Sequence, residues 1–406
     1  MNPEKHQASG GLFPGKGPQK VAMLGSMPPL RALSSYCLEL ASAIAELGKI
    51  QFLSFKKLYP SMAYPGGDLQ EDHSFPTLDH PNLTVRRHLT WYNPITWFME
   101  GFRTKADLLH AQWWSSPLCL TYAVVCLGFR LRHKPIVFTV HNVLPHDNTA
   151  LYVMISRILF KFGNHFIVHS APNREQLIKH YHIPLKQVTQ ISHGPLDFHV
   201  RVDVDREKVR KEMGFNPDDK VILLFGTIRP YKGIDTALKA FARIIKLIPE
   251  ARLLIAGKLW KNWSPYQSLI DELDIDDHIK THLEYIPSGC VWRFFEASDL
   301  VVLPYNNFDS QSGVGATAIS FRKPMIVTDV GGLPELVGDR RYVVKAKDPV
   351  GLSEIIVDCL KNPAHFSEMA SATGIVAEDM AWSSVAMKTW SVYNKVLLSA
   401  TSGEIH

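Results

Sequence analysis

The residues best suited to carry out chemistry are two cations in the second half of the chain. Arg229 and Lys232 lie in the loop 226–235, directly after an apolar run at 221–225 that predicts a strand. In parallel α/β sheets, the loops at the carboxyl ends of the strands face the ligand. An arginine binds a phosphate through two parallel hydrogen bonds, and a lysine acts as a point charge. The pair therefore predicts a phosphate site, and the alternative is a solvated loop whose charges are incidental.

A second candidate site is the loop and helix start at 309–317, which follows an expected strand at 300–303. It contains small and hydroxyl-bearing residues, namely Asp309, Ser310, Gln311, Ser312, Gly313, Val314 and Thr317. The first amide groups of a helix attract anions, and a glycine lets a ligand approach the backbone closely. Ordinary N-capping by Ser310 or Ser312 is the alternative. Because both loops belong to the same half of the chain, they favour a shared phosphate site.

The third candidate is His141, which comes directly after an expected strand at 135–140. A histidine placed there faces the cleft and suits proton handling near neutral pH. A structural histidine is the alternative. A metal site of His141, His146 and Asp147 is a weaker one, because their spacing matches no strong metal-binding pattern.

These loops need parallel sheets to position them. Short β-branched runs alternate with helical patterns along the whole chain, which is typical of parallel sheets with helices on both faces. We expect strands at 21–24, 50–55, 83–86, 107–111, 135–140, 165–169, 187–191, 221–225, 252–256, 281–285, 300–303, 324–328 and 342–344. The predicted fold class is α/β, with two doubly wound Rossmann-like domains that face each other across a cleft. We expect a disordered leader at 1–18, domains at 19–200 and 220–380, and a charged linker at 201–219.

The composition excludes several classes of protein. With 46% hydrophobic and 20% charged residues among 406, the chain is neither disordered in bulk nor collagen-like. Five scattered cysteines without CxxC spacing argue against a disulfide framework or a zinc site. The longest apolar stretch, 117–129, is shorter than the roughly 20 residues of a membrane helix. Residues 1–200 carry seven excess positive charges and residues 201–406 two excess negative ones, which indicates different partners for the two halves.

Three sequence motifs in the second half of the chain, the first of which includes Arg229 and Lys232, indicate a known family. They are the stretches 225–233 (FGTIRPYKG), 297–305 (ASDLVVLPY) and 323–335 (KPMIVTDVGGLPE). Together they resemble the family 4 retaining glycosyltransferases of the two-Rossmann-domain, GT-B type. The resemblance runs from Lys20 to about Leu398. The terminal segment 381–406 is similar to the family's last helix, which crosses back onto the first domain.

The resemblance implies roles for the site residues. Arg229 and Lys232 would hold the diphosphate of a nucleotide-sugar donor, and His141 would contact the donor sugar and support transfer. The donor site would comprise Arg229, Lys232, Asp309, Ser310, Gln311, Ser312, Gly313, Val314, Thr317 and Glu335. The first domain would bind the acceptor, with Arg31, Trp113, Trp114 and His146 as candidate contacts. Neither a cofactor nor a metal is expected.

The chain departs from the family pattern at several positions. The two family glutamates that are separated by seven residues correspond to Asp309 and Thr317. Asp309 keeps a shorter acid for the sugar hydroxyls, whereas Thr317 cannot replace a carboxylate on the ribose. A related subgroup with Ser-Gln-Ser-Gly in this loop shares the pattern, so we interpret the chain as an active variant. Thr227 stands where the family usually has its arginine, and Ala32 and Leu33 stand where it often has paired glycines.

These features predict a retaining hexosyltransferase that moves a sugar from a nucleotide-diphosphate sugar to a glycan or lipid-linked acceptor, as in polysaccharide biosynthesis. Two alternatives stay open: a nucleotide-sugar epimerase, hydrolase or phosphorylase of the same fold, and a non-catalytic glycan- or partner-binding pseudoenzyme. We expect a cytoplasmic protein without a nucleic-acid partner. The basic first half is consistent either with a basic acceptor domain in solution or with peripheral binding to an anionic membrane surface.

Overall fold

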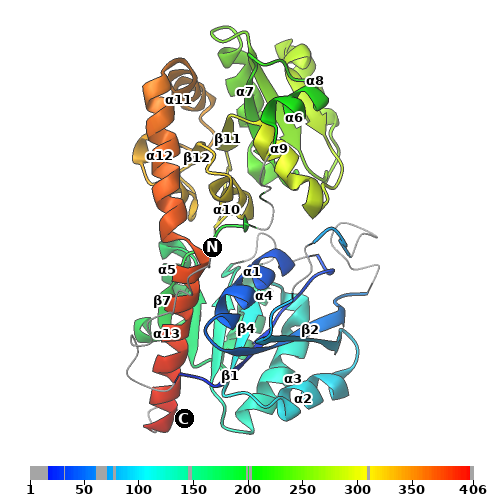
Figure 1. The fold of residues 1–406 in the computed structure, drawn as a ribbon, viewed down its shortest axis with the longest axis vertical. Coiled ribbons are helices and arrows are strands. Elements are labelled where there is room, and N and C mark those ends of the chain that lie inside the picture. Colours follow the sequence, from blue (N-terminus) through cyan, green and yellow to red (C-terminus); the bar gives the residue numbers. More distant parts are fainter. Residues whose placement is uncertain are drawn as a thin grey trace, which may run out of the picture.

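The computed structural model describes residues 17–402 except 32, 61–70, 76–78, 145–148, 198–199, 201–203 and 309–310. The predicted leader, apart from Gly17 and Pro18, thus lies outside the described residues. The chain forms two α/β domains stacked end to end (Figure 1). The first sheet contains β1 (Lys20–Leu24), β2 (Lys49–Lys57), β3 (Leu83–Thr90), β4 (Leu108–Trp113), β5 (Ile136–Val140), β6 (His165–Val168) and β7 (Val188–Gln190). The second contains β8 (Lys220–Phe225), β9 (Ala251–Ala256), β10 (Ile279–His282), β11 (Leu300–Leu303), β12 (Met325–Thr328) and β13 (Val343–Val344).

Helices cover both faces of the two sheets. Those that follow strands of the first sheet are α1 (Ser34–Ala45), α2 (Pro94–Arg103), α3 (Cys119–Arg130), α4 (Thr149–Phe160) and α5 (Ala171–Tyr181). The remaining helices are α6 (Arg206–Glu212), α7 (Ile234–Ile244), α8 (Ser264–Leu273), α9 (Val291–Ala297), α10 (Gly313–Ser320), α11 (Pro349–Lys361), α12 (Pro363–Asp379) and α13 (Trp382–Thr401). None of the described helices is long and apolar enough to cross a membrane.

The strand order identifies where a ligand would bind. The sheets run β3-β2-β1-β4-β5-β6-β7 and β10-β9-β8-β11-β12-β13, and all of these strand pairs are parallel. The order reverses between β1 and β4 in the first sheet and between β8 and β11 in the second. Ligands bind beyond the carboxyl ends of strands at such switch points. The predicted pair of doubly wound sheets is confirmed, and the loops after β8 and β11 lie at the second switch point.

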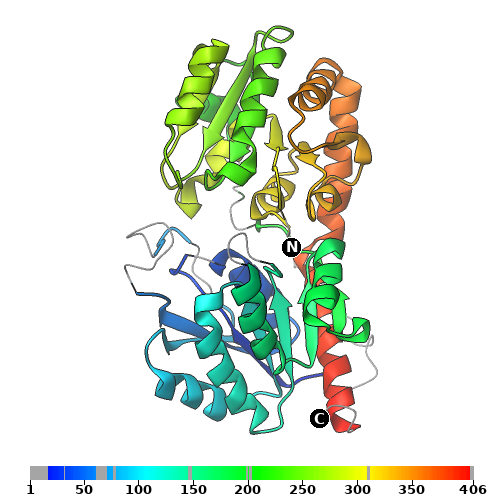
Figure 2. The same ribbon diagram turned by 180° about the vertical axis from the view of Figure 1, so that it is seen from behind.

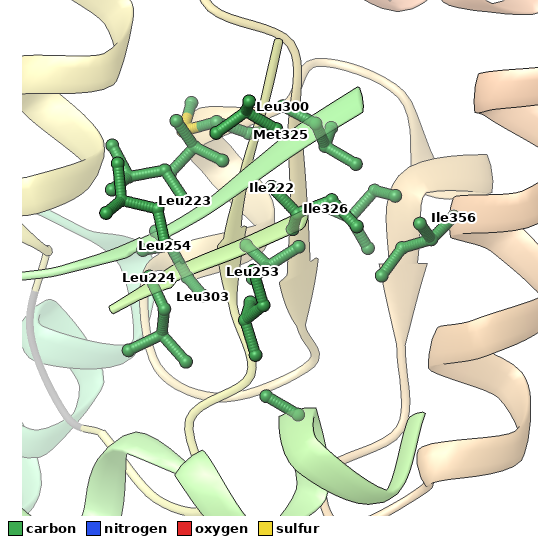
Figure 3. Packing of buried hydrophobic residues seen from close by; sticks show 14 of the residues in the cluster. Ile222, Leu223, Leu224, Leu253, Leu254, Leu300, Leu303, Met325, Ile326 and Ile356 are labelled. Carbon is green, nitrogen blue, oxygen red and sulfur yellow. The ribbon is translucent and has the colours of Figure 1, made fainter. Parts of the chain in front are cut away.

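The core of the second domain explains why its strands were easy to find. Figure 3 shows buried side chains of one cluster, among them Ile222 and Leu224 from β8, Leu253 from β9, and Met325 and Ile326 from β12. Strands that are covered on both faces are continuous apolar runs instead of alternating ones. Burying one such side chain stabilises the fold by about 1.5 to 3 kcal/mol. These strands therefore form a rigid base for the loops at their ends.

The region predicted as a linker contains a helix that packs on the second domain. Within 201–219 the structure contains α6, which Asp205 caps by accepting a hydrogen bond from the Lys208 amide. Val209 lies in the core of the second domain. Arg206 and Arg210 both form ion pairs with Asp299, just before β11. The charges in this segment hold a helix against the second domain, so α6 is part of that domain and not a free connection.

The last helix returns to the first domain. In Figure 1, α12 runs beside the second domain and α13 continues along the first. Trp390 and Tyr393 of α13 belong to the same buried cluster as Met23 of β1 and Leu40 of α1. The indole nitrogen of Trp382 donates a hydrogen bond to the carbonyl oxygen of Pro195 at 2.6 Å. The first domain is thus completed by residues from the end of the chain.

A buried carboxylate joins the two domains on the side of β2 and β10. Asp72 of the first domain accepts hydrogen bonds from the Tyr285 hydroxyl at 2.7 Å and from the Ser288 amide at 2.9 Å. Ser74 donates to the same carboxylate through its amide and its hydroxyl. The guanidinium of Arg31 lies 3.3 Å from the centre of the Tyr285 ring. Burial alone would raise the pKa of Asp72, but the hydrogen bonds from Ser74, Ser288 and Tyr285 outweigh it and lower the pKa.

Replacement of this carboxylate should therefore weaken the protein in a pH-dependent way. The lowered pKa means that Asp72 stabilises the fold above the ordinary aspartate pKa of 3.8 and loses this effect as the pH falls below that value. We expect Asp72→Asn to lose about 1 to 2 kcal/mol of unfolding free energy at pH 7 in urea titrations. The deficit should shrink near pH 3. Asp79→Asn, at an exposed position of the same region, is the control and should change stability by less than about 0.5 kcal/mol; equal losses in the two variants would contradict the role of Asp72.

Candidate active site

Lys232 is a buried cation at the switch point of the second sheet. It ends a 3-10 turn, Pro230–Lys232, in the loop that follows β8. Only 4% of the residue is exposed, and its Nζ donates a hydrogen bond of 3.0 Å to the carbonyl oxygen of Phe225. The Tyr305 ring lies 5.1 Å from Nζ. Burial lowers the pKa of Lys232, and the nearby charge of Arg229 lowers it further, whereas Tyr231 acts in the opposite direction. An anion bound here would offset both unfavourable effects.

Two glycines with positive φ bring the loops of this site together. Gly233 has φ +66°, and a Cβ there would lie 1.8 Å from the carbonyl oxygen of Pro304, in the loop after β11. Gly226 has φ +91°, and a Cβ there would lie 2.8 Å from Val314 Cγ2 and 2.9 Å from Lys232 Nζ. Both backbone conformations are ones that side-chain-bearing residues rarely adopt. The structure therefore brings the ammonium of Lys232 to the first turn of α10, as the shared phosphate site requires.

Arg229 is placed differently from Lys232. Its guanidinium stacks 3.8 Å from the centre of the Trp260 ring, and 38% of Trp260 is exposed. A cation–π contact of this kind contributes about 0.5 to 1 kcal/mol at exposed sites. Arg229 is thus near Lys232 but is held against an aromatic ring, a contact that the sequence pattern did not reveal.

The start of α10 combines a conventional cap with open space. Ser312 is the N-cap and accepts a hydrogen bond from the Gly315 amide at 3.3 Å, so the capping alternative holds for this residue. The hydroxyl groups of Ser312 and Tyr305 lie 3.1 Å apart. A Cβ on Gly313 would meet nothing within 4 Å. Thr317 donates its hydroxyl hydrogen to the carbonyl oxygen of Gly313 within the helix. Asp309 and Ser310, the remaining members of this predicted loop, lie outside the described residues.

Two of the residues predicted to bind the donor form hydrogen bonds between the domains. Gln311 accepts a hydrogen bond from the His193 amide at 2.8 Å through its side-chain oxygen. Glu335 accepts hydrogen bonds from the Ala171 amide at 3.0 Å and from the Gln190 side chain at 3.2 Å. A carboxylate at the first amide of α5 is also favoured by the helix dipole. Burial raises the pKa of Glu335, although the hydrogen bonds from the Ala171 amide and the Gln311 side chain and the charge of Arg174 act in the opposite direction. Sequence motifs do not show which side chains form hydrogen bonds between the domains.

A cavity of about 350 Å³ lies between the domains beside α10. Its walls come from α1, from the loops after strands of the first sheet and from the segment at the start of α10, and its lining includes Tyr36, Trp114, His141, His169, His193 and Gly313. The structure therefore brings the predicted His141 and the predicted start of α10 to one cavity. Among the described residues that line it, there is no carboxylate.

His141 is a buried, neutral histidine. Its Nδ1 lies 3.0 Å from Nε2 of His169, and its Nε2 lies 3.0 Å from the side-chain amide of Gln112. Tyr36 packs edge-on against its ring with the centroids 4.6 Å apart. Burial first, and then the neighbouring His169, His193 and His110, hold its pKa well below the usual value. His141 is accordingly uncharged across the physiological pH range.

The structure places the described acceptor candidates, Trp113, Trp114 and Arg31, in three different environments. The prediction of Trp113 as an acceptor contact is wrong, because Trp113 is fully buried in the core and packs against Tyr122. Trp114, one position beyond the end of β4, lines the cavity. Arg31 stacks on Tyr285 at the other end of the domain contact. His146 and Asp147 lie outside the described residues.

Sequence reasoning missed the other aromatic walls of the cavity. His169 and His193 follow β6 and β7 as His141 follows β5, and the His169 and His193 ring centroids are 5.2 Å apart. The rule that picked out His141, a histidine just past a strand end, identifies both of them as well. Tyr36 comes from α1 and carried no comparable signal. Among the described residues, no three histidine, cysteine, aspartate or glutamate side chains are grouped in a way that could hold a metal ion.

Comparison with known families identifies both halves of the chain. Residues 33–194 match the family model described as Glycosyltransferase Family 4, and residues 205–375 match the one described as Glycosyl transferases group 1. Between them, the two matches leave uncovered only the ends of the chain and residues 195–204.

Individual proteins agree with this result. The chain is 24% identical over 318 residues to a D-inositol 3-phosphate glycosyltransferase of Corynebacterium aurimucosum, which covers 73% of each protein. It is 28% identical over 251 residues to the enzyme of that name from Mycobacterium ulcerans, which covers 57% of this chain and 51% of the relative.

Solved structures share the fold at low sequence identity. HepE from Anabaena in complex with UDP and glucose has a TM-score of 0.69 at 15% identity, and covers 93% of this chain and 100% of its own. Sucrose-phosphate synthase from Thermosynechococcus elongatus has a TM-score of 0.66 at 16% identity, and covers 94% of this chain and 100% of its own. The fold is therefore GT-B. With both halves matched by the family models, the protein belongs to the family 4 glycosyltransferases.

Proposed function

We propose that this protein is a retaining glycosyltransferase that moves a hexose from a nucleotide-diphosphate sugar to a glycan or lipid-linked acceptor. The observation that carries the proposal is the meeting of Lys232 with the first turn of α10 beside the histidine-lined cavity. The solved relatives that contain UDP or UDP-glucose support a sugar nucleotide as the donor, and the curated relatives that are named D-inositol 3-phosphate glycosyltransferase support glycosyl transfer.

The diphosphate would lie between Lys232 and the amides of Gly313 and Val314. A buried ammonium and helix-terminal amides stabilise negative charge that develops as the donor's sugar–phosphate bond breaks. Arg229 would turn from Trp260 to reach the same diphosphate. The remaining proposed donor contacts are Asp309, Ser310, Gln311, Ser312, Thr317 and Glu335. The hydrogen bonds of Gln311 and Glu335 between the domains favour an indirect role for these two, in which they hold the cavity at its present width.

Retention of configuration would follow from attack of the acceptor on the face of the sugar that the diphosphate leaves. The acceptor hydroxyl attacks the anomeric carbon from the face that the diphosphate leaves, the sugar–phosphate bond breaks, and the hydroxyl proton passes to a diphosphate oxygen. No enzyme nucleophile is needed for these steps, and the described lining residues include no carboxylate to supply one. His141 would contact the sugar. Trp114 would border the acceptor, with Arg31 and His146 as further acceptor contacts.

The proposal is tested by replacing the buried cation. We expect Lys232→Met, which keeps the alkyl chain and removes the charge, to lower transfer from UDP-, GDP- or ADP-sugars at least about 100-fold. Product formation with and without acceptor is measured by chromatography, and a thermal melt checks that the variant folds. Lys261→Met, at an exposed position in the loop after β9, is the matched control and should retain full activity.

Several outcomes would contradict the proposal. An unchanged rate for Lys232→Met would remove this site as the donor site. Product without acceptor would identify an epimerase or hydrolase, and failure to bind any donor in calorimetry would favour a pseudoenzyme. An inverted anomeric coupling in the NMR spectrum of the product would exclude retention.

We also propose that the protein works in the cytoplasm with its first domain against an anionic membrane. The helices α2, α3 and α4 pack side by side on one face of the first sheet (Figure 2). They expose large apolar side chains, namely Ile95, Phe102, Leu120, Leu127, Leu151, Met154 and Ile158. Neither α3 nor α4 contains an acidic residue, and Arg130 and Arg157 lie in their last turns. Apolar side chains bordered by basic ones are typical of a surface that lies on anionic lipid.

Vesicle flotation tests this placement. We expect the protein to float with vesicles that contain 30 to 40% phosphatidylglycerol at low salt, each basic residue near the surface contributing about 1 kcal/mol. Replacing Leu151, Met154 and Ile158 together by glutamine should abolish flotation without loss of donor binding. Met387→Gln, at an exposed position of α13, is the control and should float like the unaltered protein. A protein that stays at the bottom at low salt would contradict membrane binding.

A further inference from the structure

A chain of buried polar side chains crosses the first domain from the last helix to the cavity. Every member is in hydrogen-bond distance of the next, and all are less than about a tenth exposed. In order from α13 to the cavity wall, the members are Tyr393, His110, Gln112, His141 and His169. Because each ring nitrogen either donates or accepts, one fixed end determines the direction of the others.

His169 provides the fixed end. Its Nδ1 lies 2.9 Å from the carbonyl oxygen of Ile191, and a carbonyl oxygen only accepts, so Nδ1 carries the proton. Burial lowers the pKa of His169 to about 3, with a contribution from His193, and the ring is therefore neutral. A neutral ring protonated on Nδ1 has a lone pair on Nε2. His169 thus presents an acceptor to His141.

The direction of His141 follows from that acceptor. Its Nδ1, 3.0 Å from Nε2 of His169, has to donate. Because His141 is neutral as well, its Nε2 has a lone pair and requires a donor. The side-chain amide of Gln112 faces this nitrogen at 3.0 Å. Oxygen and nitrogen of an amide are assigned from the hydrogen-bond network, so Gln112 is oriented with its NH₂ group towards His141.

The rest of the chain is consistent with this orientation. With Gln112 in this orientation, Nε2 of His110 carries a proton and has two acceptors within reach, the side-chain oxygen of Gln112 at 3.2 Å and the hydroxyl oxygen of Thr139 at 2.7 Å. His110 is neutral because burial lowers its pKa to about 3. Its Nδ1 accordingly accepts the hydrogen bond from the Tyr393 hydroxyl at 2.6 Å. Five side chains thus donate in one direction, from α13 to the carbonyl of Ile191, with no member left without a partner.

We propose that His169 is a positioning residue, which holds His141 as the tautomer with its proton on Nδ1, and that Tyr393 of α13 fixes the other end of the same chain. Both nitrogens of His141 are then engaged inside the first domain. His141 works as an oriented neutral ring at the cavity wall and does not take a proton from the acceptor. This last step rests on the proposed transfer function, whereas the hydrogen-bond chain does not.

The tautomer can be observed directly. Two-bond ¹H–¹⁵N correlation spectra of uniformly labelled protein distinguish a protonated Nδ1 from a protonated Nε2 in each histidine. We expect His141 and His169 to carry the proton on Nδ1 and His110 on Nε2 between pH 6 and 8. Protonation of His141 on Nε2 in the unaltered protein would overturn the proposal.

Variants at His169 separate positioning from packing. His169→Leu removes the acceptor, and we expect a mixture of His141 tautomers and a kcat lowered roughly ten- to a hundredfold, with little change in the KM for the donor. His169→Gln can accept from His141 and donate to Ile191, so it should restore most of kcat. His165→Gln is the matched control: His165 begins β6, the strand that His169 follows, is buried, and bonds to Thr189 outside the hydrogen-bond chain. A kcat and a His141 tautomer that are unchanged in His169→Leu would overturn the proposal.

Tyr393→Phe keeps the test available if His169→Leu fails to fold. It removes one oxygen atom, and the expected result is loss of the single His110 tautomer together with a several-fold fall in kcat. Tyr181→Phe, which removes a buried hydroxyl bonded to the carbonyl of Val143, should change neither. If the histidines show the expected tautomers but the protein transfers no sugar from any donor, the proposed function is contradicted and the hydrogen-bond chain from Tyr393 to His169 is supported.

Discussion

The structure depends on backbone contact between loops at the switch point of the second sheet. Gly233 contacts the carbonyl of Pro304, and Gly257 contacts the carbonyl of Gly226. A Cβ added to Gly257 would lie only 2.3 Å from the carbonyl oxygen of Gly226. No side chain fits at either position, so the loops after β8, β9 and β11 can approach only in this arrangement. Because of it, Lys232 is buried beneath Gly226 and faces the first turn of α10. A cation placed by backbone contacts needs no conformational change to meet an anion, which is the form of preorganisation that stabilises developing charge.

The two domains are held by carboxylates that reach across from opposite sides. Asp72 of the first domain binds the loop around Tyr285 and Ser288, whereas Glu335 of the second binds the start of α5. The contact of Glu335 adjoins the cavity, because Gln311, which lines the cavity, donates a hydrogen bond to the same carboxylate at 3.4 Å. Each carboxylate is satisfied by neutral amides or hydroxyls instead of by a cation. Hydrogen bonds of this type are less sensitive to salt than an exposed ion pair, because screening acts mainly on separated charges.

Much of the fold was predictable from the sequence, because the strands are buried on both faces and therefore stand out as apolar runs. The sites at strand ends were also predictable in outline, as Lys232, His141 and the start of α10 illustrate. Side-chain direction was harder to predict. Trp113 and Trp114 are neighbours and both pack against Tyr122, yet Trp113 is fully buried at the end of β4, whereas Trp114, one position beyond the strand, also lines the cavity. The hydrogen bonds of Gln311 and Glu335 depend on contacts between domains, and the tautomer of His141 depends on residues from β4, from the ends of β5, β6 and β7, and from α13. Spacing along the chain contains no information of these kinds.

The return of α13 to the first domain has a consequence for synthesis. Val21 and Val396 belong to one hydrophobic cluster, although nearly the whole chain separates them. A ribosome adding about 5 to 20 residues per second needs roughly 10 to 40 s to pass from the last strand of the first sheet to the end of α13. During that interval, Met23, Leu40 and Ile44 lack their partners on α13. The nascent first domain is therefore a natural client for a chaperone, and loss of the last helix would leave this apolar face open for good.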